Sequence, residues 1–114
     1  MNLPIIQGGM GVYISTPFLA SRCSRLGVLG TVSGVGAEHV FARILGRGDL
    51  SGDYRRALDH FPFQDVVERV MAQYFVERGK GRGGEFKSVP ALSFSPRRDL
   101  IELAVAASFA FVWL

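Results

Sequence analysis

The stretch LPIIQGGMG, residues 3–11, decides how we interpret this sequence. A short apolar run, residues 3–7, leads directly into four residues of which three are glycine. Short β-branched runs that end in glycines are typical of a buried strand that opens into a loop. A second such run, VLGTVS at residues 28–33, is followed by Gly34 and Gly36. We therefore expect strands at residues 3–7 and 28–33.

Helical signals alternate with these runs. Thr16 and Pro17 are typical of a helix start, because a hydroxyl caps the first amides and the proline ring already holds a helical φ. Gly27 is typical of the position that follows a helix end. Apolar residues recur at helical spacing in two further segments, 37–45 and 63–78. They recur less regularly in the short connection between these segments, residues 53–62.

The last third of the chain repeats this alternation. An apolar run at residues 89–94 predicts a third strand, in which a proline removes one ladder donor. Another hydroxyl–proline pair, residues 95–96, then precedes a segment whose apolar residues fall on one helix face, 100–107. The apolar ending, residues 109–114, predicts a fourth strand and a chain that is truncated there. Short apolar strands that alternate with helices imply an α/β fold with a parallel sheet buried on both faces.

Composition limits the class of protein. A chain of 114 residues holds at most one domain, and 48% hydrophobic residues provide a core and exclude a disordered tail. A net charge of +3 is weak support for nucleic-acid binding. The single cysteine, Cys23, excludes an intramolecular disulfide and a zinc site of several thiolates, and it favours a reducing cytoplasmic location. We identify no signal peptide and no apolar run near the roughly 20 residues that span a bilayer.

Parallel α/β folds bind ligands at the carboxyl ends of their strands, which directs attention to the loops after residues 7, 33 and 94. Gly8, Gly9, Met10 and Gly11 include no acid, base or nucleophile, but glycines let a backbone approach a flat ligand closely. This pattern favours contact with a cofactor over a catalytic dyad. A tight strand-to-helix turn without a ligand is the alternative.

Other motifs point away from common sites. Residues 34–36 lack the third glycine of a dinucleotide fingerprint, and the glycine- and lysine-containing run 79–84 follows a helix, unlike a Walker loop. His39 and His60 have no second ligand at metal spacing, so we interpret both as surface or capping residues.

The paired stretches PIIQGGMG (residues 4–11) and LGVLGTVSG (residues 26–34) resemble the opening of the nitronate monooxygenase family, also called the 2-nitropropane dioxygenase family. The resemblance continues through three later segments and covers nearly the whole chain: 54–62, 89–94 and 100–107. Members of the family are FMN-dependent (β/α)₈ barrels that oxidise alkyl nitronates with dioxygen. The resemblance implies that residues 1–114 are a partial barrel domain: the N-terminal half of a TIM-type (β/α)₈ barrel, with about four parallel strands alternating with helices.

The resemblance also implies a cofactor site. The loop Gly8–Gly11 would place its backbone against the FMN ring, and Ser93 would make a polar flavin contact at the end of the third strand. Tyr13 departs from the small residue that commonly follows the loop. Neither His39 nor His60 matches the catalytic histidine of the family, so no catalytic residue is assigned.

By this resemblance the chain is part of a cytoplasmic FMN-dependent oxidoreductase, with nitronate oxidation as the expected activity and a small-molecule substrate and dioxygen as its reactants. An FMN-dependent enoyl reductase of fatty-acid or polyketide synthesis and a non-catalytic fragment are the alternatives. The family's base and phosphate loops lie beyond residue 114, so we expect the chain alone to be inactive. The open edges of half a barrel further predict a homo-oligomer or a missing C-terminal half as the partner.

Overall fold

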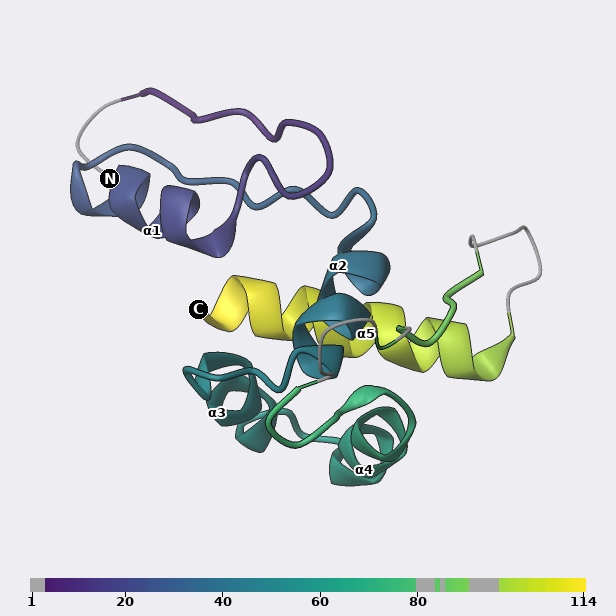
Figure 1. Cartoon of the computed structure of the whole chain (residues 1–114). Coiled ribbons are helices and arrows are strands. Elements are labelled where there is room, and N and C mark those ends of the chain that lie inside the picture. The colour runs from purple at the N-terminus through teal and green to yellow at the C-terminus, as the bar shows by residue number, and fades with distance from the viewer. Residues whose placement is uncertain (1–3, 80–83, 85, 91–96) are drawn as a thin grey trace.

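The structure is a computed structural model that describes residues 4–79, 84, 86–90 and 97–114 (Figure 1). The described residues form five helices: α1 (Pro17–Arg25), α2 (Ala37–Gly46), α3 (Asp53–Asp59), α4 (Gln64–Tyr74) and α5 (Arg98–Trp113). The longest helix, α5, packs against α2, α3 and α4. In Figure 1, α1 and two extended segments lie on one side of α5, and α3 and α4 lie on the other side.

The parallel α/β architecture expected from the sequence is wrong. In the described part of the chain, the only pairing of extended segments is an isolated parallel bridge between Ile6 and Leu29. Gln7 N donates to Leu29 O at 2.9 Å, and Leu29 N donates to Ile5 O at 3.0 Å. These two bonds join the first two expected strands, 3–7 and 28–33, but do not extend into a sheet. A helical body with one bridged pair therefore replaces the expected half of a TIM barrel.

The fourth expected strand, residues 109–114, belongs almost entirely to α5. Leu103, Ala107 and Ala110 are buried at helical spacing, and Phe111 continues the same face. A short apolar run fits a buried helix as well as a strand, so residues 109–114 by themselves do not distinguish the two. No helix of the described residues has both the length and the apolar character to cross a membrane.

The third expected strand, residues 89–94, is only partly covered by the structure. Val89 and Pro90 are not in a strand. Residues 91–94 lie outside the described residues, as does the hydroxyl–proline pair at 95–96.

The predicted helices are confirmed, but their ends shift by a few residues and the last one, α5, continues to Trp113 through the expected fourth strand. Thr16 Oγ1 accepts a hydrogen bond from Leu19 N at 3.2 Å, so the capping hydroxyl at the start of α1 acts as predicted. Gly27, just beyond α1, has φ +86°, a backbone conformation that favours glycine. The fourth helix, α4, ends at Tyr74 rather than at residue 78, because Phe75 is already extended.

The hydrophobic core lies between α5 and the three helices around it. Phe41, Leu45 and Leu103 are completely buried there. Phe41, Tyr54 and Phe111 form a triangle of rings with centroids 5.8 to 6.4 Å apart. Tilted and edge-to-face ring pairs of this kind add about 0.5–1.5 kcal/mol each to the free energy of burial. Most of the stable packing is therefore in the helical body.

Candidate functional site

The glycine loop at residues 8–11 presents bare backbone to solvent. All four residues are exposed. A Cβ atom built on Gly8 or Gly11 would have no heavy atom within 4 Å, and one built on Gly9 would lie 3.7 Å from Thr31 Cγ2. None of these glycines has a positive φ, so the backbone conformation itself does not require glycine. A side chain at Gly8 or Gly11 would fill the open space above the loop.

Ser15 holds the loop in this shape. Its hydroxyl Oγ accepts a hydrogen bond from Met10 N at 2.8 Å and lies 3.3 Å from Gly8 O, to which it donates. Ser15 is almost completely buried, with 1% of its surface exposed. A buried hydroxyl with both partners inside the loop fixes the positions of two of its four residues.

Gln7 completes the support of the loop. Its amide Nε2 donates to Gly8 O at 2.7 Å and to Ser15 Oγ at 3.2 Å, and its Oε1 accepts from Thr31 N at 3.1 Å. One side chain therefore ties the loop to the second expected strand. No role was predicted for Gln7, Ser15 or Thr31, because their role depends on three segments that meet in space.

Tyr13 connects the loop region to the helical body. It lies in the turn that follows the loop and has φ +52°, which is uncommon for a residue with a side chain. Its hydroxyl lies 3.4 Å from the hydroxyl of Tyr54, and its ring centroid lies 6.2 Å from that of Phe111. Tyr13 thus contacts the core helices.

The described contacts of the loop are uncharged. Within the part of the chain that the structure describes, the side chains that contact the loop are those of Gln7, Ser15 and Thr31. Burial, aided by the hydrogen bond with Tyr13, raises the pKa of the Tyr54 hydroxyl well above its usual value. Tyr54 therefore stays protonated at neutral pH and does not serve as a base.

The two histidines do not join the loop. His39 Nδ1 lies 3.0 Å from a carboxylate oxygen of its neighbour Glu38. His60 Nδ1 lies 2.8 Å from the carbonyl of Arg56, and its ring stacks on Trp113 with centroids 4.6 Å apart. Both are exposed surface residues, as the sequence indicated. The other predicted site residue, Ser93, lies outside the described residues.

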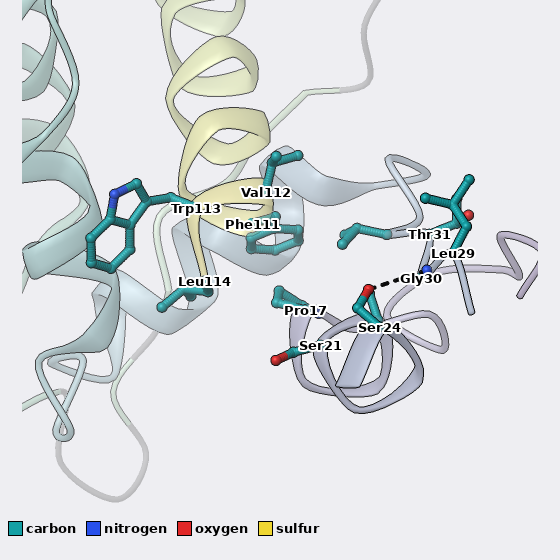
Figure 2. A pocket seen from close by; sticks show the side chains of 12 residues that line it. Pro17, Ser21, Ser24, Leu29, Gly30, Thr31, Phe111, Val112, Trp113 and Leu114 are labelled. Carbon is teal, nitrogen blue, oxygen red and sulfur yellow. Dashed lines mark hydrogen bonds between the residues drawn. The ribbon is translucent and has the colours of Figure 1, made fainter. Parts of the chain in front are cut away.

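A cavity of about 500 Å³ lies between α1, the segment 29–32 and the end of α5. Figure 2 shows Phe111 and Val112 facing the α1 side, while Trp113 points away. Hydroxyl groups come from Ser21, Ser24 and Thr31, and Ser24 Oγ already accepts from Gly30 N at 3.3 Å. Among the described residues, the lining contains no charged side chain.

Ionic groups gather elsewhere, on the surface of α4 and α5. Arg69 donates to both carboxylate oxygens of Glu102, at 3.0 and 2.9 Å, and also to Asp65 at 3.0 Å. Arg98 adds a second contact to Glu102 at 3.1 Å. Because the arginines and carboxylates already neutralise one another, the cluster serves to hold α4 against α5. We call it the Glu102 clamp. Across the described residues, no three metal-ligating side chains come together.

Comparison with known proteins adds no further assignment: no family model, no curated protein and no solved structure matches this chain. The geometry of the glycine loop and the motif at residues 4–11 and 26–34 therefore carry the functional argument.

Proposed function

We propose that this chain supplies a flavin-ring contact in an FMN-dependent oxidoreductase whose activity is the oxidation of alkyl nitronates by dioxygen. The observation that carries the proposal is the loop Gly8–Gly11, where exposed backbone with open space above it is held by a buried hydroxyl. The resemblance of residues 4–11 and 26–34 to nitronate monooxygenases supports the same assignment.

The loop fits one face of a flat aromatic ring. Without Cβ atoms at Gly8 and Gly11, a planar ligand can lie in contact with the backbone. The amides of Gly9 and Gly11 have no intramolecular acceptor among the described residues, and they can donate to the carbonyl oxygens and ring nitrogens of a flavin. Ser15 and Gln7 keep the loop in place before the ring arrives, which lowers the entropy lost on binding.

The residues around the loop orient the ring and leave the redox step to the cofactor. Bound FMN supplies the electron transfer. His39 and His60 have partners away from the loop, and Tyr54 stays protonated, so none of these three removes a substrate proton there. The described side chains that contact the loop are uncharged, so the loop offers a phosphate no ionic partner among the described residues. We therefore expect the chain to recognise the ring and to gain little from the phosphate of FMN.

A titration with two flavins tests this assignment. Lumiflavin carries the ring alone, and FMN adds the ribityl phosphate. We expect both to bind the chain with similar dissociation constants, measured by quenching of flavin fluorescence. Gly8→Val and Gly11→Val, which fill the open space, should each weaken binding by about tenfold or more, a loss of about 1.4 kcal/mol.

Gly34→Val is the matched control, because Gly34 is also exposed, has open space around it and does not belong to the loop. It should bind lumiflavin as the unchanged chain does. Loss of binding in Gly34→Val equal to that in Gly8→Val, or no binding of either flavin by the unchanged chain, would contradict the assignment. Consumption of dioxygen on addition of an alkyl nitronate, measured with an FMN-loaded complex that contains this chain, tests the activity separately.

A further inference from the structure

The bridged pair has one open edge, and we propose that this edge pairs in antiparallel fashion with the same edge of a second copy of the chain. The contact would form a homodimer. It uses the outer side of residues 5–7 and is independent of the flavin contact proposed for the loop.

The two edges of the bridged pair differ. On the outer side of residues 28–31, Val28 N donates to Cys23 O at 3.3 Å and Gly30 N donates to Ser24 Oγ at 3.3 Å. A Cβ on Gly30 would lie 2.0 Å from the carbonyl oxygen of Ala20, so α1 lies directly against this edge. The edge formed by the second segment is therefore closed by α1.

The edge formed by the first segment is open. Ile5 O and Gln7 N both point towards Leu29. In a parallel pair, the amide and carbonyl groups of the intervening residue, Ile6, point the opposite way. Accordingly, Ile6 N and Ile6 O have no hydrogen-bond partner among the described residues. An edge with unpaired amide and carbonyl groups is a template for another strand.

The side chains at this edge favour an apolar partner. Ile5 is 53% exposed and Ile6 is 64% exposed. Residues 4–21 include no charged side chain, so the edge lacks the lysines that commonly prevent strand pairing. Removal of these side chains from water would stabilise a complex by about 25 cal/mol for each Å² buried.

A second copy fits this edge by symmetry. A two-fold axis beside Ile6 makes the two edges antiparallel and places Ile6 opposite Ile6 of the partner, so that each amide can donate to the other carbonyl. An apolar edge without charge does not repel its own copy. The four paired segments would also stabilise the bridged pair, because two paired segments alone are only marginally stable in water.

Sedimentation of the full chain between 1 and 100 μM tests the proposal. We expect a monomer–dimer equilibrium. Ile6→Pro removes the outward amide while keeping both inner bonds of Ile5 and Gln7, and proline is tolerated where the amide faces solvent. Ile6→Pro and Ile6→Lys should both shift the protein to monomer. Leu50→Lys is the matched control, because Leu50 is 83% exposed in the helical body, and it should leave the dimer intact.

Hydrogen exchange of the Ile6 amide gives a second readout. In the unchanged chain, exchange should slow at least tenfold as the concentration rises through the dimerisation range. A chain that stays monomeric at 100 μM, a dimer that survives Ile6→Pro, or an Ile6 amide whose exchange does not depend on concentration would each overturn the proposal. Larger, polydisperse assemblies would overturn it as well, because a two-fold contact closes at two copies.

Discussion

At the scale of single residues, the Ser15 hydroxyl is the main support of the glycine loop. It bonds to both Met10 N and Gly8 O from a buried position. Ser15→Ala should destabilise the fold by about 1–2 kcal/mol and speed hydrogen exchange at Met10 by roughly tenfold, because the amide loses its acceptor. Ser108→Ala is the control, since that exposed hydroxyl bonds only to the carbonyl of Ala104 on the same helix. Equal effects of the two changes would contradict this role.

The side chain of Asp49 caps the first turn of α3. Its buried carboxylate accepts from Tyr54 N at 3.4 Å and Arg55 N at 2.9 Å, and its φ is +42°. Asp49→Ala loses both of these bonds and a third contact, from Arg55 Nε at 3.4 Å. It also adds the cost of a left-handed residue without a polar side chain, so we expect a loss of about 2–3 kcal/mol in urea unfolding. Asp49→Asn keeps one acceptor and tolerates this backbone, so we expect about 1 kcal/mol. A larger loss in Asp49→Asn would show that charge, rather than backbone geometry, dominates.

Some of these residue roles were predictable and others were not. Thr16 was predicted as a cap because the hydroxyl and the amide that it caps are three residues apart in the sequence. The bonds of Ser15 to residues 8 and 10 are nearly as local, but serine five residues after a methionine is not a recognised signal. Gln7 could not be assigned, because its partner Thr31 is 24 residues away.

At the scale of elements, the Glu102 clamp between α4 and α5 makes stability depend on pH. Hydrogen bonds from Arg69, and to a lesser degree from Arg98, hold the pKa of Glu102 below its usual value of 4.5. The carboxylate therefore stabilises the folded state above pH 4.5, and this contribution is lost as the pH falls through the lowered pKa. Thermal midpoints should decrease less between pH 5 and pH 3 in Glu102→Gln than in the unchanged chain.

Glu68→Gln is the control for this pH dependence, because Glu68 is exposed on α4 and belongs to no ion pair of the described residues. It should follow the unchanged chain. Some pH dependence should remain in Glu102→Gln, since Arg69 also lowers the pKa of Asp65. Identical pH profiles for Glu102→Gln and the unchanged chain would show that the clamp does not stabilise the fold.

The elements also show where sequence patterns fail. Helices with a capping signal or a long apolar stripe, such as α1 and α4, were predicted to within a few residues. Residues 109–114 were misassigned because six consecutive apolar residues show no period of their own, and the decisive information is the buried face of α5 that precedes them. Strands were predicted at residues 3–7 and 28–33, but the described residues of these segments share a single bridge, Ile6 to Leu29, with no third segment beside them.

At the scale of the whole molecule, stability should be concentrated in the helical body around α5. Leu103 is completely buried there, and Val105, on the same helix, is 48% exposed. Leu103→Ala should cost about 2–5 kcal/mol in urea unfolding, because it leaves a cavity in a packed core. Val105→Ala should cost less than about 1 kcal/mol. Similar losses at both positions would be inconsistent with a helix that buries one face.

The proposed contact between a flat flavin ring and the loop Gly8–Gly11 can be followed residue by residue in an NMR titration with lumiflavin. Amide shifts in a ¹⁵N-labelled chain report which residues the ring approaches. We expect the largest changes at Gly8, Gly9 and Gly11, with smaller changes at Thr31 beside them and none on α4. Shifts that concentrate on another surface, or a loop that does not respond to lumiflavin, would contradict the claim.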